Sequence, residues 1–385
     1  MSINGVFMDI ILCVTGSIAA IEAVKLAREL RRQGATIKCF MSDGACNIIH
    51  PYAMEFASGN DVILELTGEI EHVKYANADL ILVAPATANV ISKFACKISD
   101  NPINALLISA LGYGTPIVIA PSMNLSMYKA IKHNIEKLVE EGVIFVPPRI
   151  EEGKAKFPDL DDIVLTVLRG VSPGDLKGRR VLVSAGGTYE AIDPVRGVCN
   201  LSSGKMGLEL AKEAFIQGAD VTIIGANLSV PVPSCIRRVD VLSAAEMFDR
   251  VRDLIGDFDI FISAAAVADF RPEYTKSKIS SSRERSLKLE PNPKIIDSIK
   301  SLNPDVYLVG FKAEYDIGEE ELIELAREQI ERSGADLVVA NDLAVEGFGS
   351  DKIKPILVSD KVHKLPLIDK RELSRILIKL ISQSL

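Results

Sequence analysis

Residues 179–217 read RRVLVSAGGTYEAIDPVRGVCNLSSGKMGLELAKEAFIQ and contain, in order, an apolar strand, a glycine-rich loop and an amphipathic helix. We predict the strand over Arg179–Ser184 and the helix over Gly204–Gln217, because apolar residues recur there at the spacing typical of each element. A glycine-rich turn between a strand and a helix directs free backbone N–H groups toward an anion, most often a phosphate. Residues 193–207 add arginine, asparagine, two serines and lysine to this loop, so we interpret it as an anion-binding loop rather than a linker.

The same alternation of strands and helices runs through the whole chain and begins twice. The strands are short apolar runs, which suit parallel sheets that helices cover on both faces. In the first half we predict strands at Asp9–Val14, Ala35–Met41, Leu80–Ala84, Pro116–Ala120 and Val143–Val146, and a helix at Ile18–Gln33. In the second half we predict further strands at Asp220–Ile224, Ile260–Ala264, Tyr307–Phe311 and Asp336–Ala340, helices at Ala244–Ile255, Glu319–Ser333 and Lys370–Ser384, and a hairpin over Ile356–Leu365. The sequence therefore predicts an α/β fold of two doubly wound Rossmann-like domains, residues 1–172 and 173–385.

Composition excludes several classes of protein. A chain of 385 residues is longer than one ordinary core, and its net charge of −8 disfavours a nucleic-acid partner. The six cysteines form no C-x-x-C pair and the four histidines are dispersed, which argues against a disulfide framework or a zinc site. No apolar run reaches the length of a membrane span and no signal-like segment opens the sequence, so we expect a cytoplasmic protein without a membrane partner.

Polar and small residues follow the predicted strands of the first half. Gly16 and Ser17 come directly after the first strand, and Ser42 follows the second. PATAN (residues 85–89) and PSMNLSMY (residues 121–128) follow the next two strands. Because ligands of open α/β sheets bind at the carboxyl ends of the strands, we expect these segments to line one site. His72 does not directly follow a predicted strand. A single histidine on a helix is more often structural than catalytic.

Together, GSIAA (residues 16–20), the His72 segment, PATAN and PSMNLSMY resemble the homo-oligomeric flavin-containing cysteine decarboxylases. The similarity covers about residues 8–160 and is closest to phosphopantothenoylcysteine decarboxylases. It implies a flavodoxin-like domain in which FMN serves to oxidise the cysteinyl thiol of the substrate, so that the neighbouring carboxylate leaves as CO₂. His72 would then be the acid–base residue, and Asn124 would bind the substrate carboxylate. The residues that would hold FMN are Gly16, Ser17, Ser42, Pro85, Ala86, Thr87, Ala88 and Asn89.

One segment departs from that family. Bacterial members carry a mobile Ala-Cys-Gly clamp whose cysteine returns a proton to the intermediate. The matching segment here, Glu152–Pro158, has Lys156 in place of that cysteine, which leaves the proton donor open. We expect this polar, glycine-containing segment to be mobile. Lys154 and Lys156 are either attractive to a phosphate or simply solvated.

The second half resembles phosphopantothenate–cysteine ligases over about residues 178–385. The similarity rests on SAGGTYE (184–190), IDPVR (192–196), the loop Asn200–Gly207, AAAVADF (264–270), GFKAE (310–314) and AND (340–342). It implies a nucleotide-binding domain in which a carboxylate attacks the α-phosphate of CTP, giving an acyl cytidylate and pyrophosphate. The amine of cysteine then displaces the nucleotide to form an amide. Mg²⁺ is expected with the triphosphate, although the sequence does not identify its ligands.

The ligase resemblance also implies roles for individual residues. Asn200 would hold the acyl cytidylate for attack by the amine, and Arg196 would stabilise it. Lys278, or alternatively Lys276, would act from a mobile flap over residues 276–282. Lys312 is equally well interpreted as a phosphate ligand or as a solvated lysine, and Cys199 is expected to pack. Phosphates would be bound by Gly186, Gly187, Ser202, Ser203, Gly204, Lys205 and Met206, and the base and ribose by Asp269 and Phe311.

The two resemblances together imply a bifunctional enzyme of coenzyme A biosynthesis. It would ligate 4′-phosphopantothenate to cysteine and then decarboxylate the product to 4′-phosphopantetheine. The families also imply trimers through the first domain and dimers through the second, and therefore a dodecamer. The alternative, an FMN-binding regulatory protein, is disfavoured by His72, Asn124 and the ligase half. An NAD-dependent oxidoreductase is disfavoured because neither first strand precedes G-x-G-x-x-G.

Overall fold

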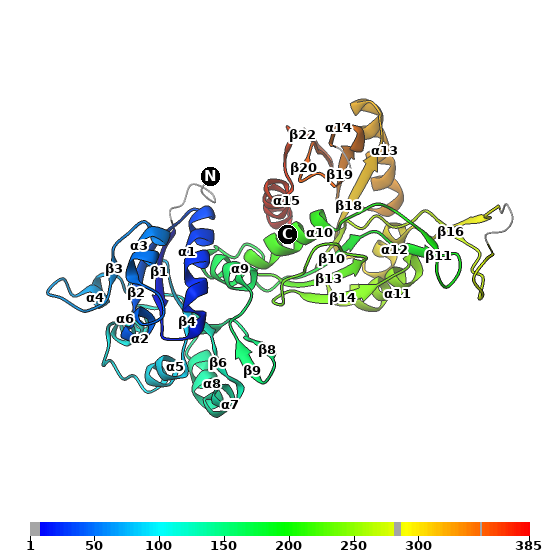
Figure 1. Cartoon of the computed structure of the whole chain (residues 1–385). Helices are drawn as coiled ribbons and strands as arrows, with labels where there is room; N and C mark the ends of the chain where they lie inside the picture. The colour runs from blue at the N-terminus through cyan, green and yellow to red at the C-terminus, as the bar shows by residue number, and fades with distance from the viewer. Residues whose placement is uncertain (1–7, 281–285, 347–348) are drawn as a thin grey trace. The chain divides into compact units, whose positions relative to one another are not determined.

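The structure is a computed structural model that describes residues 8–280, 286–346 and 349–385. The chain forms two compact units, Met1–Ser172 and Pro173–Leu385 (Figure 1). Each unit is a sheet between two layers of helices, as the predicted doubly wound fold requires. Within the described ranges, no helix combines the length and apolar character needed to cross a membrane.

The N-terminal unit contains a six-stranded parallel sheet with the order β3-β2-β1-β4-β5-β7. Without the two-residue edge strand β3 this is the flavodoxin-like order 2-1-3-4-5, and with β3 it is the Rossmann order 3-2-1-4-5-6. The main-sheet strands are β1 (Met8–Val14), β2 (Ala35–Met41), β3 (Val62–Ile63), β4 (Leu80–Ala86), β5 (Ile117–Pro121) and β7 (Ile144–Phe145). A second, three-stranded sheet consists of β6 (Met123–Asn124), β9 (Lys154–Lys156) and β8 (Arg149–Glu151).

Helices cover both faces of this sheet, which is why all seven residues of β4 are buried. On one face α1 (Ala23–Arg32) packs against α3 (Pro51–Ser58) and α9 (Leu160–Val171). On the other, α5 (Ala88–Ala95) packs against α6 (Pro102–Tyr113) and α8 (Lys132–Glu140). The shorter helices are η2 (Ile18–Glu22), α2 (Asp43–Cys46), α4 (Glu71–Lys74) and α7 (Leu125–Ala130). The predicted helix Ile18–Gln33 is therefore two elements, because the Ser17 hydroxyl accepts from Ala19 N–H and starts a tighter 3₁₀ turn before α1.

The C-terminal unit contains an eight-stranded sheet with the order β14-β13-β10-β15-β18-β19-β21-β22. The first six strands are parallel in the Rossmann order, and the last two form the predicted antiparallel hairpin. The strands are β10 (Arg180–Gly186), β13 (Asp220–Ala226), β14 (Arg237–Val241), β15 (Ile260–Ser263), β18 (Tyr307–Glu314), β19 (Leu337–Asp342), β21 (Ile356–Val358) and β22 (Val362–Lys364).

Two apolar cores lie on the two faces of this second sheet. One forms under α10 (Lys205–Ile216) and α15 (Lys370–Ser384). The other forms under α11 (Ala244–Leu254), α12 (Ile295–Leu302) and α13 (Glu319–Ser333). The remaining helices are η3 (Ile255–Asp257) and α14 (Leu343–Glu346). Three two-stranded ribbons leave the sheet: β11 (Tyr189–Ala191) with β12 (Gly197–Cys199), β16 (Phe270–Pro272) with β17 (Leu289–Pro291), and β20 (Lys352–Ile353) with β23 (Ile368–Asp369).

Gly186 marks the closest backbone approach at the end of β10. Its φ is +85°, and a Cβ atom there would lie 1.9 Å from the carbonyl oxygen of Ala226 on β13. We predict that Gly186→Ala lowers the free energy of unfolding by more than the about 1–3 kcal/mol that the left-handed backbone alone costs a non-glycine residue. Urea unfolding measures this change. Gly256→Ala, with no other atom within 4 Å of the added carbon, is the control, and equal midpoints for the two variants would contradict the prediction.

Glu319 fastens the β21–β22 hairpin region to the start of α13. Its carboxylate accepts hydrogen bonds from Lys364 and Lys354, at 2.8 and 2.9 Å, and these lower its pKa from 4.5 to about 2. A carboxyl group whose pKa is depressed by folding adds stability above its unfolded pKa and loses that stability as pH falls toward the folded pKa. We therefore predict that Glu319→Gln lowers the melting temperature slightly at pH 7 and that this difference disappears between pH 4.5 and 2. Glu320→Gln is the matched control, and a difference that grows as the pH falls would contradict the assignment.

Candidate active sites

A buried threonine closes the point in the N-terminal sheet where the strand order reverses, between β1 and β4. The Thr15 hydroxyl donates to Pro85 O at 2.7 Å and accepts from Thr87 N–H at 3.0 Å. Its own N–H donates to Pro85 O at 3.3 Å. The segment after β1 and the loop after β4 are thus joined by three hydrogen bonds at the carboxyl edge, where open α/β sheets bind ligands.

Gly16 and Ser17 lie beside this junction. A Cβ atom on Gly16 would lie 2.9 Å from backbone atoms of Gly44, so the turns after β1 and β2 touch at two glycines. The Ser17 hydroxyl donates to that of Ser122, 3.1 Å away in the segment after β5. Ser42 caps α2, with its hydroxyl accepting from Ala45 N–H. The structure therefore brings the segments that follow four strands to one edge.

The end of β4 and the start of α5 together provide small buried residues and a helix N-terminus. Pro85, Ala86 and Ala88 are buried, Thr87 caps α5 with its hydroxyl, and Asn89 is exposed in the first turn of that helix. Small side chains leave room for a flat ring against the backbone, while serine and threonine hydroxyls and helix-start N–H groups suit a phosphate. This donor set fits a mononucleotide with a planar ring.

Asn124 lies where β6 ends and α7 begins. Its side-chain oxygen accepts from the N–H and the hydroxyl of Ser126, at 2.9 and 2.8 Å, which fixes the direction of the amide. On β6, Asn124 pairs with Lys154 of β9. The segment expected to be mobile is thus a regular hairpin, and its Ala155 is fully buried.

Charge pairs bind this hairpin to itself. Lys156 Nζ lies 3.0 Å from carboxylate oxygens of both Glu151 and Glu152, and these contacts raise the lysine pKa, that of Glu152 contributing most. Arg149 lies 3.3 Å from Asp159 in the same region. The ammonium group of Lys156 is thus paired with two exposed carboxylates, and the expectation that this lysine attracts a phosphate stays a prediction.

His72 lies in the one-turn helix α4. Its Nδ1 is buried and has no hydrogen-bond partner among the described residues. The loop before it is closed by Glu71, whose carboxylate accepts from the N–H and the hydroxyl of Thr67, at 2.8 and 2.5 Å. Within the part of the chain that the structure describes, no hydrogen bond or ion pair connects the His72 side chain with Gly16, Ser42 or Asn124.

The C-terminal unit closes its own reversal point, between β10 and β15, in the same way. The N–H of Thr188 donates to Ala266 O at 3.3 Å, and its buried hydroxyl accepts from Ala268 N–H at 2.8 Å. Gly187 is bridged to Ala266, and its carbonyl accepts from the Asn227 side chain at 2.8 Å. AAAVADF therefore lies against GGT, as one site at this edge requires.

The anion-binding loop begins α10 at Gly204, whose φ is +78°. The hydroxyls of Ser202 and Ser203 accept from the N–H groups of Gly204 and Lys205, both at 3.4 Å. The ammonium group of Lys205 forms an ion pair with the Asp351 carboxylate, 2.7 Å away. Met206 packs partly against the core under α10 and α15, so its side chain is structural in this arrangement.

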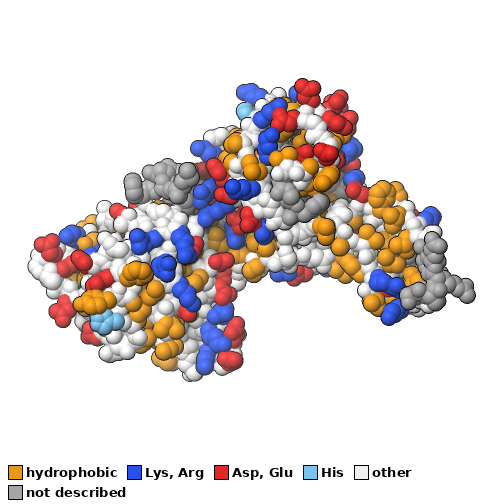
Figure 2. All heavy atoms as spheres, turned by 45° about the horizontal axis from the view of Figure 1, so that its top comes forward, with side chains coloured by type: hydrophobic (Ala, Val, Ile, Leu, Met, Phe, Trp, Pro, Cys, Tyr) orange, Lys and Arg blue, Asp and Glu red, His pale blue; other side chains and the backbone are white. Residues whose placement is uncertain are grey.

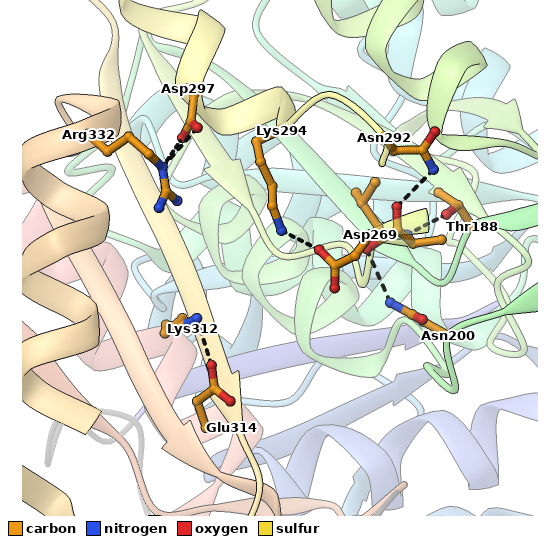
Figure 3. A network of polar contacts seen from close by, with 11 residues as sticks. Thr188, Asn200, Asp269, Asn292, Lys294, Asp297, Lys312, Glu314 and Arg332 are labelled. Carbon is orange, nitrogen blue, oxygen red and sulfur yellow. Dashed lines mark hydrogen bonds and ion pairs between the residues drawn. The ribbon is translucent and has the colours of Figure 1, made fainter. Parts of the chain in front are cut away.

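A polar network surrounds Asp269 (Figure 3). The Asn200 amide donates to Val267 O at 3.1 Å, which ties the anion-binding loop to the segment after β15. Asn292 donates from its side chain to Ala268 O and from its backbone to Asp269 O, at 2.9 and 2.8 Å. Lys294, at the start of α12, forms an ion pair with the Asp269 carboxylate. Asn200 and Asp269 are therefore both attached to one loop.

Phe311 and Lys312 follow on β18. Phe311 is partly buried against the core under α10 and α15. Lys312 Nζ lies 2.6 Å from Glu314 and forms an ion pair on the strand, as Figure 3 also shows. Like Lys156, this partly exposed lysine has a carboxylate partner, and its interpretation as a phosphate ligand stays a prediction.

Arg196 is bound to Asp193 within the turn between β11 and β12. The guanidinium and the carboxylate approach to 2.6 Å, while the arginine side chain remains 43 % exposed. Lys276 and Lys278 lie on an exposed segment that is distant in sequence but hydrogen-bonded to this turn, and the last two residues of the predicted flap, 281 and 282, lie outside the described residues. Cys199 is exposed on β12, so the expectation that it packs is wrong, because the ribbon leaves the core.

Sequence reasoning missed the groups that hold the two edges together. Thr15, Thr188, Asn292 and Asp193 make the connecting hydrogen bonds, and their only sequence signal is a polar residue next to a predicted strand end or glycine-rich turn. No group of three or more histidine, cysteine, aspartate or glutamate side chains among the described residues could hold a metal ion.

Family models and relatives cover almost the whole chain. Residues 5–172 match the model described as Flavoprotein, and residues 176–385 match the DNA/pantothenate metabolism flavoprotein C-terminal domain. A Coenzyme A biosynthesis bifunctional protein CoaBC of Thermococcus kodakarensis is 51% identical over 95% of this chain and 92% of that protein. The protein of that name from Methanocaldococcus jannaschii is 41% identical over 96% and 92%. The crystal structure of the DNA/pantothenate metabolism flavoprotein from Streptococcus pneumoniae covers 54% of this chain and all of that one, with 27% identity and a TM-score of 0.50.

Thr15 offers a test of the junction in the N-terminal unit. Thr15→Val keeps the side-chain shape but removes the hydroxyl that Thr87 N–H and Pro85 O share. An unpaired buried donor costs about 1–3 kcal/mol, so we predict a loss of that size in the unfolding free energy measured with urea. Thr15→Ser keeps the hydroxyl and should recover most of the loss. A valine variant as stable as the wild type would show that the hydroxyl does not hold the edge.

Proposed function

The chain belongs to the family of bifunctional CoaBC proteins of coenzyme A biosynthesis, and from this premise we propose which part performs which step. It is an enzyme with a flavoprotein decarboxylase domain and a ligase domain. We assign the ligation of 4′-phosphopantothenate to cysteine to residues 173–385 and the decarboxylation of the product to residues 1–172. The observation that carries this division is that each unit has its own reversal point with a glycine-containing loop at the carboxyl edge.

In the ligase step, the residues after β10 and before α10 would bind CTP and its Mg²⁺. Gly186 and Gly187 let the backbone at this edge pack closely against Ala226 and Asn200, and the 202–206 loop offers serine hydroxyls and the start of α10, a combination that suits phosphates. Asp269, held by Asn292 and Lys294, would accept from ribose hydroxyls, and Phe311 would contact the base. The choice of CTP over ATP is part of the proposal.

Asn200 and Arg196 would act on the activated carboxyl group. The Asn200 amide already donates to Val267 O, so its side chain lies between the anion-binding loop and the segment that leads to Asp269. Arg196 uses one side of its guanidinium for Asp193 and keeps exposed surface for an anion. Lys278 or Lys276 would supply a second positive charge from the flap as negative charge develops on the α-phosphate.

In the decarboxylase step, the N-terminal edge fits FMN by its donor set. Gly16, Ser17 and Ser42 would hold the phosphate side, and the Pro85–Asn89 loop would contact the ring. When bound, FMN supplies the reversible two-electron oxidation of the substrate thiol that makes loss of CO₂ possible. Asn124, oriented by Ser126, would bind the substrate carboxylate through its amide.

His72 would remove and return protons, a role that suits an imidazole because histidine titrates near neutral pH. Since no described contact connects it with the other predicted residues, we propose that it serves a site completed by a second copy of the chain. Ile18, Ile21, Tyr52 and Phe56 expose apolar surface on η2 and α3, which supports a trimer of this unit.

The C-terminal ribbons support the proposed dimer. Orange side chains gather on the arm at the right of Figure 2, over these ribbons. A dimer through this surface and a trimer through the N-terminal unit combine into the proposed dodecamer. The exposed apolar residues of this dimer surface are Val195, Val198, Leu201, Phe270, Tyr274, Leu287 and Leu289.

All six cysteines are free thiols, which suits the reducing cytoplasm that we propose as the location of the protein.

One assay tests the proposed function. The purified protein is incubated with 4′-phosphopantothenate, cysteine, Mg²⁺ and one nucleoside triphosphate at a time, and the products are identified by mass. We expect pyrophosphate and a mass loss of CO₂ after ligation, with CTP as the preferred nucleotide. If no triphosphate releases pyrophosphate, the ligase assignment is wrong. If the protein has no flavin absorbance and releases no CO₂, the decarboxylase assignment is wrong.

His72 separates the two steps. We predict that His72→Asn leaves ligation unchanged and slows decarboxylation by roughly 10²–10⁴-fold, the usual contribution of a general acid–base group. 4′-Phosphopantothenoylcysteine should then accumulate, as mass spectrometry of the product mixture would reveal. His133→Asn, on the exposed surface of α8, is the matched control. Continued decarboxylation by the His72 variant would reject the assignment.

A further inference from the structure

The Asp193 carboxylate is a fully buried charge on the turn between β11 and β12. Its Oδ1 accepts from the backbone N–H groups of Val195 and Arg196, at 2.8 and 2.9 Å. Those two bonds are what an aspartate at the start of a turn ordinarily makes. Its Oδ2 has other donors, which are the Arg196 side chain at 2.6 and 3.1 Å and the backbone N–H of Ile279 at 3.0 Å. One oxygen therefore holds the turn, and the other reaches a segment 86 residues away.

Ile279 is bound at both of its backbone groups. Its N–H donates to Asp193, and its carbonyl oxygen accepts from the Arg196 Nη2. The Asp193–Arg196 pair thus offers Ile279 one acceptor and one donor, as a neighbouring strand would. Four residues earlier, the N–H of Thr275 donates to Ile192 O at 2.9 Å. The segment Thr275–Ile279 is therefore attached at both ends to the turn that carries Arg196.

Lys276 and Lys278 lie between these two attachment points. Both side chains are exposed, so the docking of the segment comes from its backbone and leaves the two ammonium groups free to face a ligand. The same turn leads through β12 directly to Asn200. A single carboxylate consequently controls where the flap lysines lie relative to Asn200 and the anion-binding loop.

We propose that Asp193 is a positioning residue of the ligase site, which acts with Arg196 as a latch that holds the Lys276–Lys278 segment in place. This rests on the proposed ligase function, and it gives Arg196 a second task beside its contact with the acyl nucleotide. A turn residue alone would need only Oδ1. The hydrogen bond from the Ile279 N–H lowers the pKa of Asp193 most. Desolvation raises this pKa, but the hydrogen bonds from Arg196 add to the lowering, so the pKa stays well below its usual range.

Asp193→Asn changes this latch at one atom. The amide oxygen can still accept from Val195 and Arg196, so the turn keeps its bonds. The amide nitrogen replaces Oδ2, and because it is itself a donor it cannot accept from the two Arg196 nitrogens or the Ile279 N–H. Both Arg196 and Ile279 are therefore released. Ile279→Pro removes the N–H that the latch holds and restricts the backbone at residues 278 and 279, but it leaves the Asp193 and Arg196 side chains unchanged.

The experiment has two readouts on the full-length protein. Trypsin cleavage after Lys276, a bond that stays cleavable in both variants, is followed by mass spectrometry without nucleotide, and the pyrophosphate release rate is measured with CTP, 4′-phosphopantothenate and cysteine. Loss of charge-assisted hydrogen bonds should raise the cleavage rate by roughly ten-fold to a hundred-fold in both variants. In the same variants kcat for ligation should fall roughly ten-fold to a hundred-fold, with a much smaller change in the KM for CTP, because the flap lysine acts in the transition state.

Asp240→Asn is the matched control. Asp240 also receives an arginine, Arg238, at 2.6 and 2.7 Å, but on the exposed edge strand β14. It should change neither readout. The latch is overturned if Asp193→Asn and Ile279→Pro are cleaved at the wild-type rate, or if they are cleaved faster while kcat stays at the wild-type value. If the wild type itself releases no pyrophosphate with CTP, the ligase function fails instead, and the cleavage rates still decide whether the latch exists.

Discussion

The structure depends on how two adjacent parallel strands are joined at the point where each sheet reverses its order. In the N-terminal unit Thr15 joins the segment after β1 to the loop after β4, and in the C-terminal unit Thr188 joins the segment after β10 to the one after β15. In both, the threonine N–H donates to a carbonyl of the facing loop, and the buried hydroxyl accepts from an N–H of that loop. The Thr15 hydroxyl also donates, to Pro85 O. Each candidate site lies at the edge that this junction closes.

From the same junction the two units build different sites. The N-terminal unit covers its edge with a short sheet, in which β6 carries Asn124 and pairs with β9. The C-terminal unit instead sends out ribbons, and the turn of the β11–β12 ribbon holds the segment Thr275–Ile279. A compact cover suits a cofactor that stays bound through many turnovers. A segment held by a few hydrogen bonds suits a triphosphate that must enter and a pyrophosphate that must leave.

Local patterns predicted the elements well, and contacts between distant segments set the limit. Glu319–Ser333 and Lys370–Ser384 are helices with the predicted bounds, because apolar spacing and helix-start residues are local signals. Ribbon strands of two or three residues, such as Phe270–Pro272, are too short to show any period. The role of Asp193 depends on Ile279, and no pattern within a window of sequence relates them. The predicted phosphate ligand Lys205 and the undecided Lys312 were recognisable as cations, but their partners Asp351 and Glu314 appear only when the chain is folded.

The lysine at the clamp position shows what such a partner does to chemistry. A thiol can give up a proton at neutral pH because its ordinary pKa is only slightly above that value. Lys156 begins with a much higher pKa, and its hydrogen bonds to Glu152 and Glu151 raise that pKa further. A group that holds its proton so firmly is a poor general acid at neutral pH. Lys156 is therefore poorly suited to the proton-donor role of the clamp cysteine in the family that this unit resembles, and an imidazole suits that role better by type. The ammonium group of Lys156 is better suited to stabilising the β8–β9 hairpin that pairs with Asn124, since both glutamates that hold it lie at the turn of that hairpin.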